Sequence, residues 1–339
     1  MMGILEMRGL IAALRAAAEP TRLRILLLLA GGELNVKDLT QILGQSQPRI
    51  SRHLKLLVAA GLIERFREGS WAYFHVSERS EGGRLARRLL EAVDRADPIV
   101  RRDSERAEAL KRERETAAQA YFRDHAADWD RIRTLHVSER EVEAAMLEAL
   151  GPGPFKLLLD LGTGTGRALE LFAPRFERGI GLDLNQSMLA YARSKLAKAG
   201  PLNAEVRHGD IYNLALPDGV AQAVIMHQVL HYLSDPALAV AEAARVLAPG
   251  GRLLIVDFAP HDLAFLRERH AHERLGFPRE QVGQWLAEAG LETLETRELR
   301  PASSDGPEKL TVSLWLAERA SGAAESHPPP RAPELERIR

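Results

Sequence analysis

The 339-residue chain contains no cysteine. Disulfide bonds, thiolate zinc sites and cysteine nucleophiles are therefore excluded. Long apolar runs are also missing: the longest, Ile25 to Ala30, is far shorter than the ~20 residues that a helix needs to cross a bilayer. The charged residues Glu6 and Arg8 interrupt the N-terminal apolar stretch and argue against a signal peptide. We therefore expect a cytoplasmic protein with no membrane partner.

An excess of charge of one sign is lacking as well. The formal net charge is −1, so the overall charge indicates no particular partner. Residues 1–100 carry a net charge of +4 and the remainder carries −5. This asymmetry is compatible with nucleic-acid binding by the N-terminal part, but it is weak evidence alone.

The first eighty residues show helical patterns that end at glycines, followed by a hairpin pattern. Helices are predicted over 4–18, 20–30, 36–43 and 46–61. The first of them has an apolar side made of Ile4, Met7, Leu10, Ile11 and Leu14. Two strand-like runs, 62–67 and 71–76, flank a Glu-Gly-Ser turn and predict a β-hairpin.

The fourth predicted helix has one apolar and one polar, basic side. We expect its apolar side in the core: Ile50, Leu54, Leu57 and Val58. The other side carries the candidate DNA-contacting residues Gln47, Arg49, Ser51, Arg52 and Lys55. The second helix of a helix-turn-helix enters the major groove, where Arg and Gln read base edges and Lys and Ser hold phosphates. The hairpin would be a wing, with Arg65 and Arg67 against the DNA backbone or minor groove. Composition alone fits a plain basic helix in a helical bundle equally well.

Linked motifs favour the DNA-binding interpretation. EPTRLRILLLL at 19–29, the stretch 36–69 and the run WAYFHV resemble the ArsR family of winged-helix repressors. The resemblance implies a winged helix-turn-helix domain over 1–82, a homodimer built from the first helix and the helix after the wing, and a double-stranded DNA operator. Many ArsR relatives sense metals through Cys, or through Asp, His and Glu after the wing. Because the chain has no Cys and residues 78–120 have no His, we expect no metal site.

After the predicted hairpin, the sequence pattern indicates a helical segment and then an alternation of strands and helices. A charged helical segment over 83–120, broken only near Pro98, is predicted to serve dimerisation and to link the domains. Strands then alternate with helices, at about 156–161, 179–184, 204–208, 222–227, 252–258, 291–299 and 310–318. This alternation predicts an α/β domain over 121–319 with a seven-stranded, mainly parallel sheet. The Pro- and Ala-rich tail, 320–339, is predicted to be disordered.

Ligand-binding signals follow the first three of these strands. A glycine-rich turn, D-x-G-x-G-x-G at 160–166, lets the backbone approach a ligand closely, and its spacing differs from the dinucleotide motif G-x-G-x-x-G. The second strand ends at Asp183, where an acid can bind both ribose hydroxyls. The third is followed by Asp210 and Ile211, which are placed to meet an adenine ring. Open α/β sheets bind ligands at these carboxyl ends.

With VLAPGGRLLIVDF at 246–258, these motifs resemble class I S-adenosylmethionine (SAM)-dependent methyltransferases of the ubiquinone/menaquinone type, which have a Rossmann-like fold. The resemblance implies that SAM or S-adenosylhomocysteine binds to Asp160, Gly162, Thr163, Gly164, Gly166, Asp183, Leu184, Asp210, Ile211 and His227. His227 and Gln228 would face the transferred methyl group, and His227 is the candidate catalytic residue. An NAD-binding domain is the main alternative.

The methyl acceptor is not encoded in any motif. The run MHQVLHYL lacks the Asn/Asp-Pro-Pro-Tyr motif of DNA amino-methyltransferases, and the absence of cysteine removes cytosine-C5 and arsenite chemistry. A small-molecule acceptor remains. Candidate general bases are His227, His231, His270 and His272. We expect His227 and His231 to share a helix face, and Tyr121, Trp129 and His136 to lie in a lid over the cofactor.

Two functions are therefore open. The chain is interpreted as a transcriptional regulator whose methyltransferase domain senses SAM or S-adenosylhomocysteine, or methylates a small molecule. Alternatively, it is a working metabolite methyltransferase whose DNA-binding domain is autoregulatory.

Overall fold

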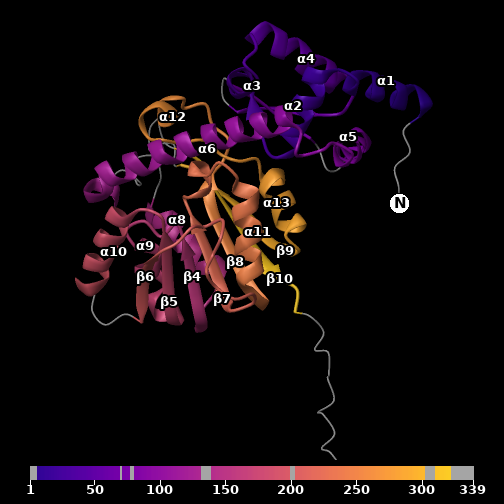
Figure 1. Ribbon diagram of the computed structural model, residues 1–339. Helices are drawn as coiled ribbons and strands as arrows, with labels where there is room; N and C mark the ends of the chain where they lie inside the picture. The colour runs from indigo at the N-terminus through magenta and orange to yellow at the C-terminus, as the bar shows by residue number, and fades with distance from the viewer. Residues whose placement is uncertain are drawn as a thin grey trace, which may run out of the picture.

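Helices α1 to α5 and a small antiparallel sheet form the N-terminal lobe (Figure 1). The structure is a computed structural model that describes residues 6–68, 71–76, 80–130, 139–198, 203–301 and 310–321. The helices are α1 (Met7–Ala17), α2 (Pro20–Ala30), α3 (Val36–Leu43), α4 (Gln47–Ala59) and α5 (Glu81–Glu91). The strands are β1 (Leu34–Asn35), β2 (Glu64–Glu68) and β3 (Trp71–His75), in the order β1-β3-β2. The predicted helices and hairpin are confirmed.

Local signals in the sequence fix the helix-turn-helix. Asn35 and Asp38 form a capping box at the start of α3, which satisfies two backbone N–H groups that the first turn leaves unpaired. Gly44, with φ of 65°, ends α3 in the left-handed conformation that glycine adopts without strain. Ile50 and Leu54 of α4 are buried in the core of the lobe. The turn between α3 and α4 is therefore determined locally, and the core holds the two helices together.

Helix α6 (Pro98–His125) connects the two lobes (Figure 1). The segment predicted as one interrupted helix is two helices, α5 and α6, and the second extends to His125. Asp97 starts α6 by accepting hydrogen bonds from the N–H groups of Ile99 and Val100. The N-terminal part of α6 packs on α2 and α3, where the Asp103 carboxylate binds the Arg24 guanidinium at 2.7 Å.

The C-terminal lobe contains a seven-stranded sheet in the order β6-β5-β4-β7-β8-β10-β9. Its strands are β4 (Phe155–Leu161), β5 (Phe176–Asp183), β6 (Ala204–His208), β7 (Ala221–His227), β8 (Leu247–Phe258), β9 (Leu291–Leu299) and β10 (Val312–Arg319). Pairing is parallel from β6 to β8, and β10 lies antiparallel between β8 and β9. All seven predicted strands are present, and β8 begins five residues before its predicted start.

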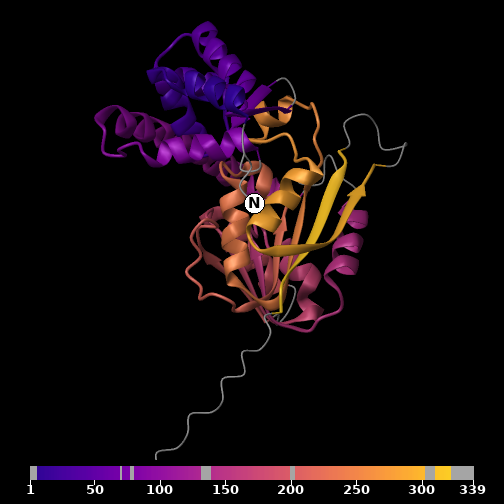
Figure 2. The same cartoon turned by 90° about the vertical axis from the view of Figure 1, so that its right-hand side faces the viewer.

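Helices cover both faces of this sheet (Figures 1 and 2). One face packs against α8 (Glu139–Leu150), α9 (Arg167–Phe172) and α10 (Gln186–Lys198), and the other against α11 (Pro236–Val246) and α13 (Arg279–Glu288). Successive residues of a strand serve opposite faces: Leu158 of β4 belongs to the first core cluster and Leu159 to the second. Two covered faces explain why the central strands read as continuous apolar runs.

The remaining described elements are short. Helix α12 (Phe265–Arg269) and the 3₁₀ helices η1 (Ala126–Asp128), η2 (Ala173–Arg175) and η3 (Leu230–Tyr232) lie in connections. In the part of the chain that the structure describes, no helix is long and apolar enough to cross a membrane. The predicted disordered tail falls, apart from residues 320 and 321, outside the described residues, as do Ile4 and His136.

Candidate DNA-binding surface and cofactor pocket

Helix α4 presents the polar side chains predicted to contact DNA. The exposed residues of this set are Gln47, Arg49, Ser51, Arg52 and Lys55. Leu57, on the opposite side, is fully buried. Val58 was predicted in the core and this is wrong: its side chain is 37% exposed, because it lies at the edge of the buried stripe. Arg65 of β2 is exposed, while the side chain of Arg67 lies outside the described residues.

His53 lies beside the basic side of α4 but is turned toward α2. Its Nδ1 atom is 3.6 Å from Glu19 Oε2. Glu19 in turn accepts a hydrogen bond from the Arg22 N–H at 2.8 Å and so caps α2. Burial lowers the pKa of His53, and the nearby cations Arg22, Arg49 and Arg52 lower it further against the opposing effect of Glu19. His53 is therefore uncharged at neutral pH, and its Nδ1 atom makes no hydrogen bond within the described residues.

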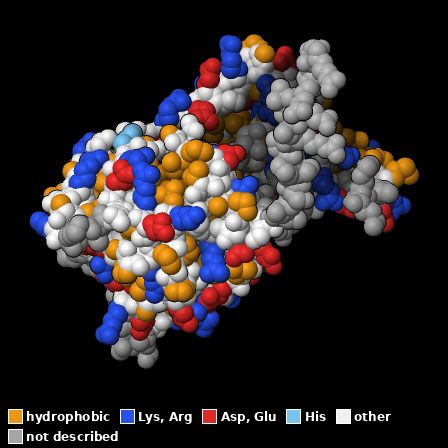
Figure 3. All heavy atoms as spheres, turned by 90° about the horizontal axis from the view of Figure 1, so that it is seen from below, with side chains coloured by type: hydrophobic (Ala, Val, Ile, Leu, Met, Phe, Trp, Pro, Cys, Tyr) orange, Lys and Arg blue, Asp and Glu red, His pale blue; other side chains and the backbone are white. Residues whose placement is uncertain are grey.

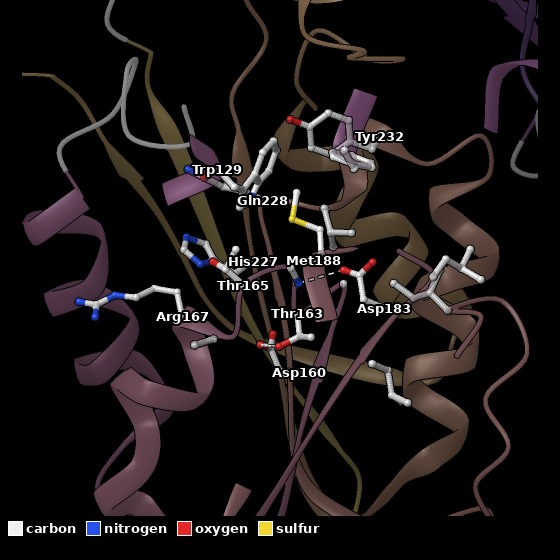
Figure 4. Close-up of a pocket in the computed structure, with 18 of the residues that line it drawn as sticks. Trp129, Asp160, Thr163, Thr165, Arg167, Asp183, Met188, His227, Gln228 and Tyr232 are labelled. Carbon is white, nitrogen blue, oxygen red and sulfur yellow. Dashed lines mark hydrogen bonds between the residues drawn. The ribbon is translucent and has the colours of Figure 1, made fainter. Parts of the chain in front are cut away.

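The predicted ligand pocket lies at the carboxyl ends of the parallel strands, where residues of α6 and η3 also line it (Figure 4). Its floor is the glycine-rich turn between β4 and α9. Gly162 and Gly164 have φ values of 73° and 53°, which favour glycine. A Cβ atom on Gly162 would lie 2.3 Å from Val229 Cγ2, so the position has no room for a side chain. The glycines thus keep this backbone close to the pocket.

Two carboxylates are tied to this turn (Figure 4). Asp160, at the end of β4, accepts a hydrogen bond from Thr163 Oγ1 at 2.6 Å, and both residues are buried. Asp183, at the end of β5, accepts hydrogen bonds from the N–H groups of Gly164 at 2.9 Å and Asn185 at 2.8 Å. Burial raises the pKa of Asp183, while these hydrogen bonds oppose the rise by stabilising the carboxylate. Both acids are therefore preorganised.

Most of the predicted cofactor-binding residues are brought together here. Those that line the pocket are Asp160, Gly162, Thr163, Gly164, Asp183, Leu184, Ile211 and His227. Two others lie outside the lining. Asp210 accepts a hydrogen bond from the Tyr212 N–H at 2.9 Å and so shapes the loop that carries Ile211. Gly166 is the N-cap residue of α9, between the lining residues Thr165 and Arg167.

Aromatic side chains roof the pocket (Figure 4). Phe122 of α6 packs edge-on against Tyr232 and Trp129, with ring centroids 4.7 and 5.3 Å apart. Gln119 also lines the pocket, and its carbonyl accepts a hydrogen bond from Asn185 Nδ2 at 3.0 Å. Trp129 was predicted in a lid, but Gln119, Phe122 and Tyr232 were missed because no motif marks them. The predicted helical segment ended at residue 120, before Phe122, and Tyr232 lies in η3, so no predicted element placed these two side chains at the pocket.

His227 and Gln228 close the pocket at the end of β7. Gln228 is a non-glycine residue with φ of 53°, a strained conformation that its surroundings must hold in place. Its Nε2 atom is buried and has no hydrogen-bond partner among the described residues, although it lines the pocket. A buried donor of this kind calls for a polar ligand atom. Both residues line the pocket, and their role at the methyl group stays a prediction.

The other histidines predicted as bases do not line the pocket. His227 ends a strand and His231 lies in η3, so the expected shared helix face is wrong. His231 is buried and its Nδ1 atom is 2.7 Å from Asp257 Oδ1. The His270 Nδ1 atom is hydrogen-bonded to the Tyr121 hydroxyl at 2.8 Å. Tyr121 does not line the cofactor pocket. Within the described residues, no group of three or more His, Asp or Glu side chains could hold a metal.

The fold and the pocket define a methyltransferase domain joined to a winged helix-turn-helix domain. Residues 159–255 match the methyltransferase domain family, and residues 19–65 match the bacterial regulatory proteins of the arsR family. A solved complex of the Haloferax volcanii Trm112 methyltransferase activator with a methyltransferase shares the fold, with a TM-score of 0.50 and 22% identity; the match covers 59% of this chain and 97% of that one.

Two curated relatives extend the match. An uncharacterised 37.1 kDa protein in transposon Tn4556 of Streptomyces fradiae is 31% identical over 237 residues, which is 62% of this chain and 67% of the relative. A demethylmenaquinone methyltransferase of Deinococcus radiodurans is 36% identical over 156 residues, 44% of this chain and 64% of the relative. The chain thus spans about two thirds of each relative's length. It belongs to the family of the S. fradiae protein, and it carries an arsR-type regulatory domain together with a methyltransferase domain.

The residues of the pocket fit the cofactor of this class of enzyme, SAM. The glycine-rich turn presents backbone to the ligand, Asp183 offers a carboxylate for ribose hydroxyls, and Ile211 offers an apolar surface for adenine. The buried Gln228 donor supplies a further polar contact. The expected cofactor is thus supported by the matched family and by the chemistry of the lining.

Proposed function

We propose that the protein is a homodimeric, cytoplasmic, ArsR-type transcriptional regulator whose methyltransferase domain binds SAM or S-adenosylhomocysteine and transmits pocket occupancy to DNA binding. The observation that carries this proposal is the position of α6. Its Asp103 and Arg106 hold α2 and α3 of the winged helix, through the Arg24 guanidinium and the Ile42 carbonyl. Its Gln119 and Phe122 line the cofactor pocket.

One helix therefore contacts both the winged helix, at α2 and α3, and the cofactor pocket. A ligand that displaces Phe122 or Gln119 shifts the helix that supports the helix-turn-helix. A ligand that binds the DNA-free and the DNA-bound protein with different affinities would change the operator affinity by the same factor. Rigid secondary elements with two arrangements are the physical basis of such coupling.

In the DNA complex, we propose that α4 lies in the major groove. Arg49, Arg52 and Gln47 would read base edges, and Ser51 and Lys55 would bind phosphates. Support comes from the exposure of all five side chains on one side of a helix whose other side is packed. The mixture of basic and acidic side chains elsewhere is visible on the face shown in Figure 3, where neither sign dominates.

The homodimer is proposed from an exposed apolar side of α1. The side chains of Met7, Leu10, Ile11 and Leu14 are 76%, 36%, 42% and 42% exposed. They recur at helical spacing, while Ala13 on the other side is buried in the lobe. A contiguous exposed apolar stripe of this kind marks an interaction surface. A second copy would cover it and place two recognition helices on one operator.

For the cofactor, we propose that Asp183 binds the ribose hydroxyls, that Ile211 and Leu184 contact the adenosine, and that the glycine-rich turn with Asp160 and Thr163 surrounds the methionine part. Asp210 would position Ile211 through the loop backbone. His227 and Gln228 would face the methyl group.

The test is a titration of the purified protein with DNA from upstream of its own gene, at fixed salt because phosphate contacts make affinity salt-dependent. It is run without ligand, with SAM and with S-adenosylhomocysteine. We expect either ligand to shift the DNA affinity several-fold. Tight binding that is indifferent to both would contradict the proposal.

The geometry of His227 and Gln228 favours a second function, methylation of a small molecule. His227 ends β7 at the pocket, where a general base must lie to take a proton from an acceptor hydroxyl or amine. One matched relative is a demethylmenaquinone methyltransferase, which makes a ring-bearing metabolite a reasonable acceptor class. In this version the DNA-binding domain would regulate the enzyme's own gene. Release of S-adenosylhomocysteine only in the presence of an acceptor would establish it.

A further inference from the structure

A second hollow lies between the two lobes, on the other side of Tyr232 from the cofactor pocket. Its volume is about 510 Å³, which is within the range of small-molecule sites. The winged helix contributes one wall, α6 a second, and the segment around α12 a third. These walls contain Asn35, Lys37, Asp38, Gln41, Tyr73, Leu110, Glu113, Arg114, Ala117, Ala118, Tyr232, Arg267, Glu268, Ala271, His272 and Glu273.

Ion pairs between the lobes frame this hollow. Arg114 of α6 binds the buried Asp38 of α3 on one side and Glu273 on the other, the latter at 3.0 Å. Nearby, Arg274 binds Glu33 at 2.8 Å. The Asp38 carboxylate also accepts a hydrogen bond from the Asn35 N–H in the capping box of α3, so the wall of the hollow and the start of α3 share one carboxylate.

The chemistry of the lining selects a class of ligand. Three aromatic side chains from three different segments contribute to the lining: Tyr232 is half-buried, whereas Tyr73 and His272 are buried. Three cationic side chains stand against four carboxylates, and Arg114 is already paired. Such a balanced wall gives no net attraction for a polyanion such as a nucleotide. It suits a neutral or zwitterionic molecule with an aromatic ring and hydrogen-bonding substituents.

Tyr232 connects the two sites, because it lines both the hollow and the cofactor pocket. A molecule in the hollow would touch the roof of the cofactor pocket at one end. At the other end it would touch Asp38, Gln41 and Tyr73 of the winged helix.

We propose that this hollow binds a small aromatic, neutral or zwitterionic molecule, and that the winged helix responds to its presence. This proposal rests on the proposed function in one respect: the response to the ligand is measured as DNA binding. Occupancy would alter the bridge that Arg114 makes between Asp38 and Glu273, and with it the support of α3.

Because the chain contains no cysteine, one introduced cysteine is the only thiol, and a thiol reagent labels the hollow selectively. Ala117→Cys places it on the α6 wall, and Thr116→Cys places it one residue away, exposed and outside the lining. Both proteins are treated with N-phenylmaleimide, a neutral aromatic probe. We expect the Ala117→Cys adduct to change operator affinity at least about fivefold, and the Thr116→Cys adduct to change it less than about twofold. Equal affinities for two fully labelled proteins would overturn the proposal.

A second measurement does not depend on DNA. The rate of maleimide labelling of Ala117→Cys is followed with millimolar 4-hydroxybenzamide, a neutral aromatic probe, and with benzene-1,3-disulfonate, a dianionic one. We expect the neutral probe alone to slow labelling, with no effect at Thr116→Cys. Failure of the neutral probe to slow labelling, or equal protection by the dianion, would refute the site.

Gln41→Cys, on the winged-helix wall, replaces Ala117→Cys in both experiments if Ala117→Cys lowers the melting temperature. If SAM and S-adenosylhomocysteine leave DNA binding unchanged while protection persists, only the proposed function fails.

Discussion

The two candidate binding regions are built in opposite ways. The α4 side chains that are predicted to contact DNA are exposed on a packed helix. The acids Asp160 and Asp183 of the cofactor pocket instead accept hydrogen bonds from the glycine-rich turn. The pocket is complete within one chain. In the proposed DNA complex, the α4 surface would span only part of a palindromic operator, and a second copy bound at the exposed apolar side of α1 would add the rest. We therefore expect oligomerisation to determine the affinity for DNA and to leave the affinity for the cofactor unchanged.

The largest expected effect follows from breaking the dimer. Leu10→Glu with Leu14→Glu introduces four like charges across the proposed interface. We expect a monomer whose operator affinity is reduced by about 100-fold or more, because the second half-site no longer binds at high effective concentration. Analytical ultracentrifugation and a DNA titration measure this, with exposed Ala12→Glu as the control on the other side of α1. SAM affinity should not change; a parallel loss would mean that the pocket also needs the partner.

The next effect concerns the enclosed site. Asp183→Ala should lower the affinity for S-adenosylhomocysteine at least about tenfold, equivalent to about 1.4 kcal/mol, because it removes the acceptor for the ribose hydroxyls. Calorimetry measures the affinity, and Asp262→Ala, at an exposed position outside the lining, is the control. Ligand-free operator binding should be unaffected. Normal ligand binding by Asp183→Ala would show that the ribose role is wrong.

A smaller effect is expected at the exposed site. Arg49→Ala or Arg52→Ala should each weaken operator binding by about fivefold to tenfold, near the low end of the range for base contacts. Arg101→Ala, an exposed arginine on α6, is the matched control. A reduced salt slope with unchanged sequence preference would identify a phosphate contact instead of base reading. If both variants bind DNA as tightly as the parent, the recognition-helix assignment is wrong.

The smallest effect is a pH dependence of stability. Because burial lowers the pKa of His53 below its ordinary 6.5, the unfolded chain takes up the proton first as the pH falls. The stabilising contribution is therefore present above about pH 6.5 and is lost as the pH falls through the lowered pKa. In urea titrations between pH 8 and 5, His53→Gln should lose less stability than the parent. Identical pH profiles would exclude this role for His53.

The sequence predicted what depends on neighbouring residues. The glycine turn at 160–166, the acid Asp183 and all seven strands are found as expected, because each is determined by local spacing. The start of α6 was predicted only loosely, although Asp97 before Pro98 is a helix-start signal: a capping carboxylate followed by a proline suited to the first turn.

What depends on packing between distant segments was missed. Phe122 and Tyr232 are more than a hundred residues apart and meet only because α6 crosses the sheet. The separation of His231 from the pocket follows from its pairing with Asp257 on β8. Neither feature has a period or a motif, so neither could be predicted from the sequence. The hollow between the lobes could not be predicted for the same reason, because its walls come from segments far apart in the sequence.

Coupling between the cofactor pocket and the DNA-binding surface is tested most directly by the effect of DNA on ligand affinity. The affinity for S-adenosylhomocysteine is measured by calorimetry on the free protein and on the protein saturated with its operator. Coupling between the sites requires that DNA change the ligand affinity by the same factor by which the ligand changes DNA affinity. We predict equal factors of several-fold. Ligand affinities that are identical with and without DNA would contradict the claim that α6 joins the two sites energetically.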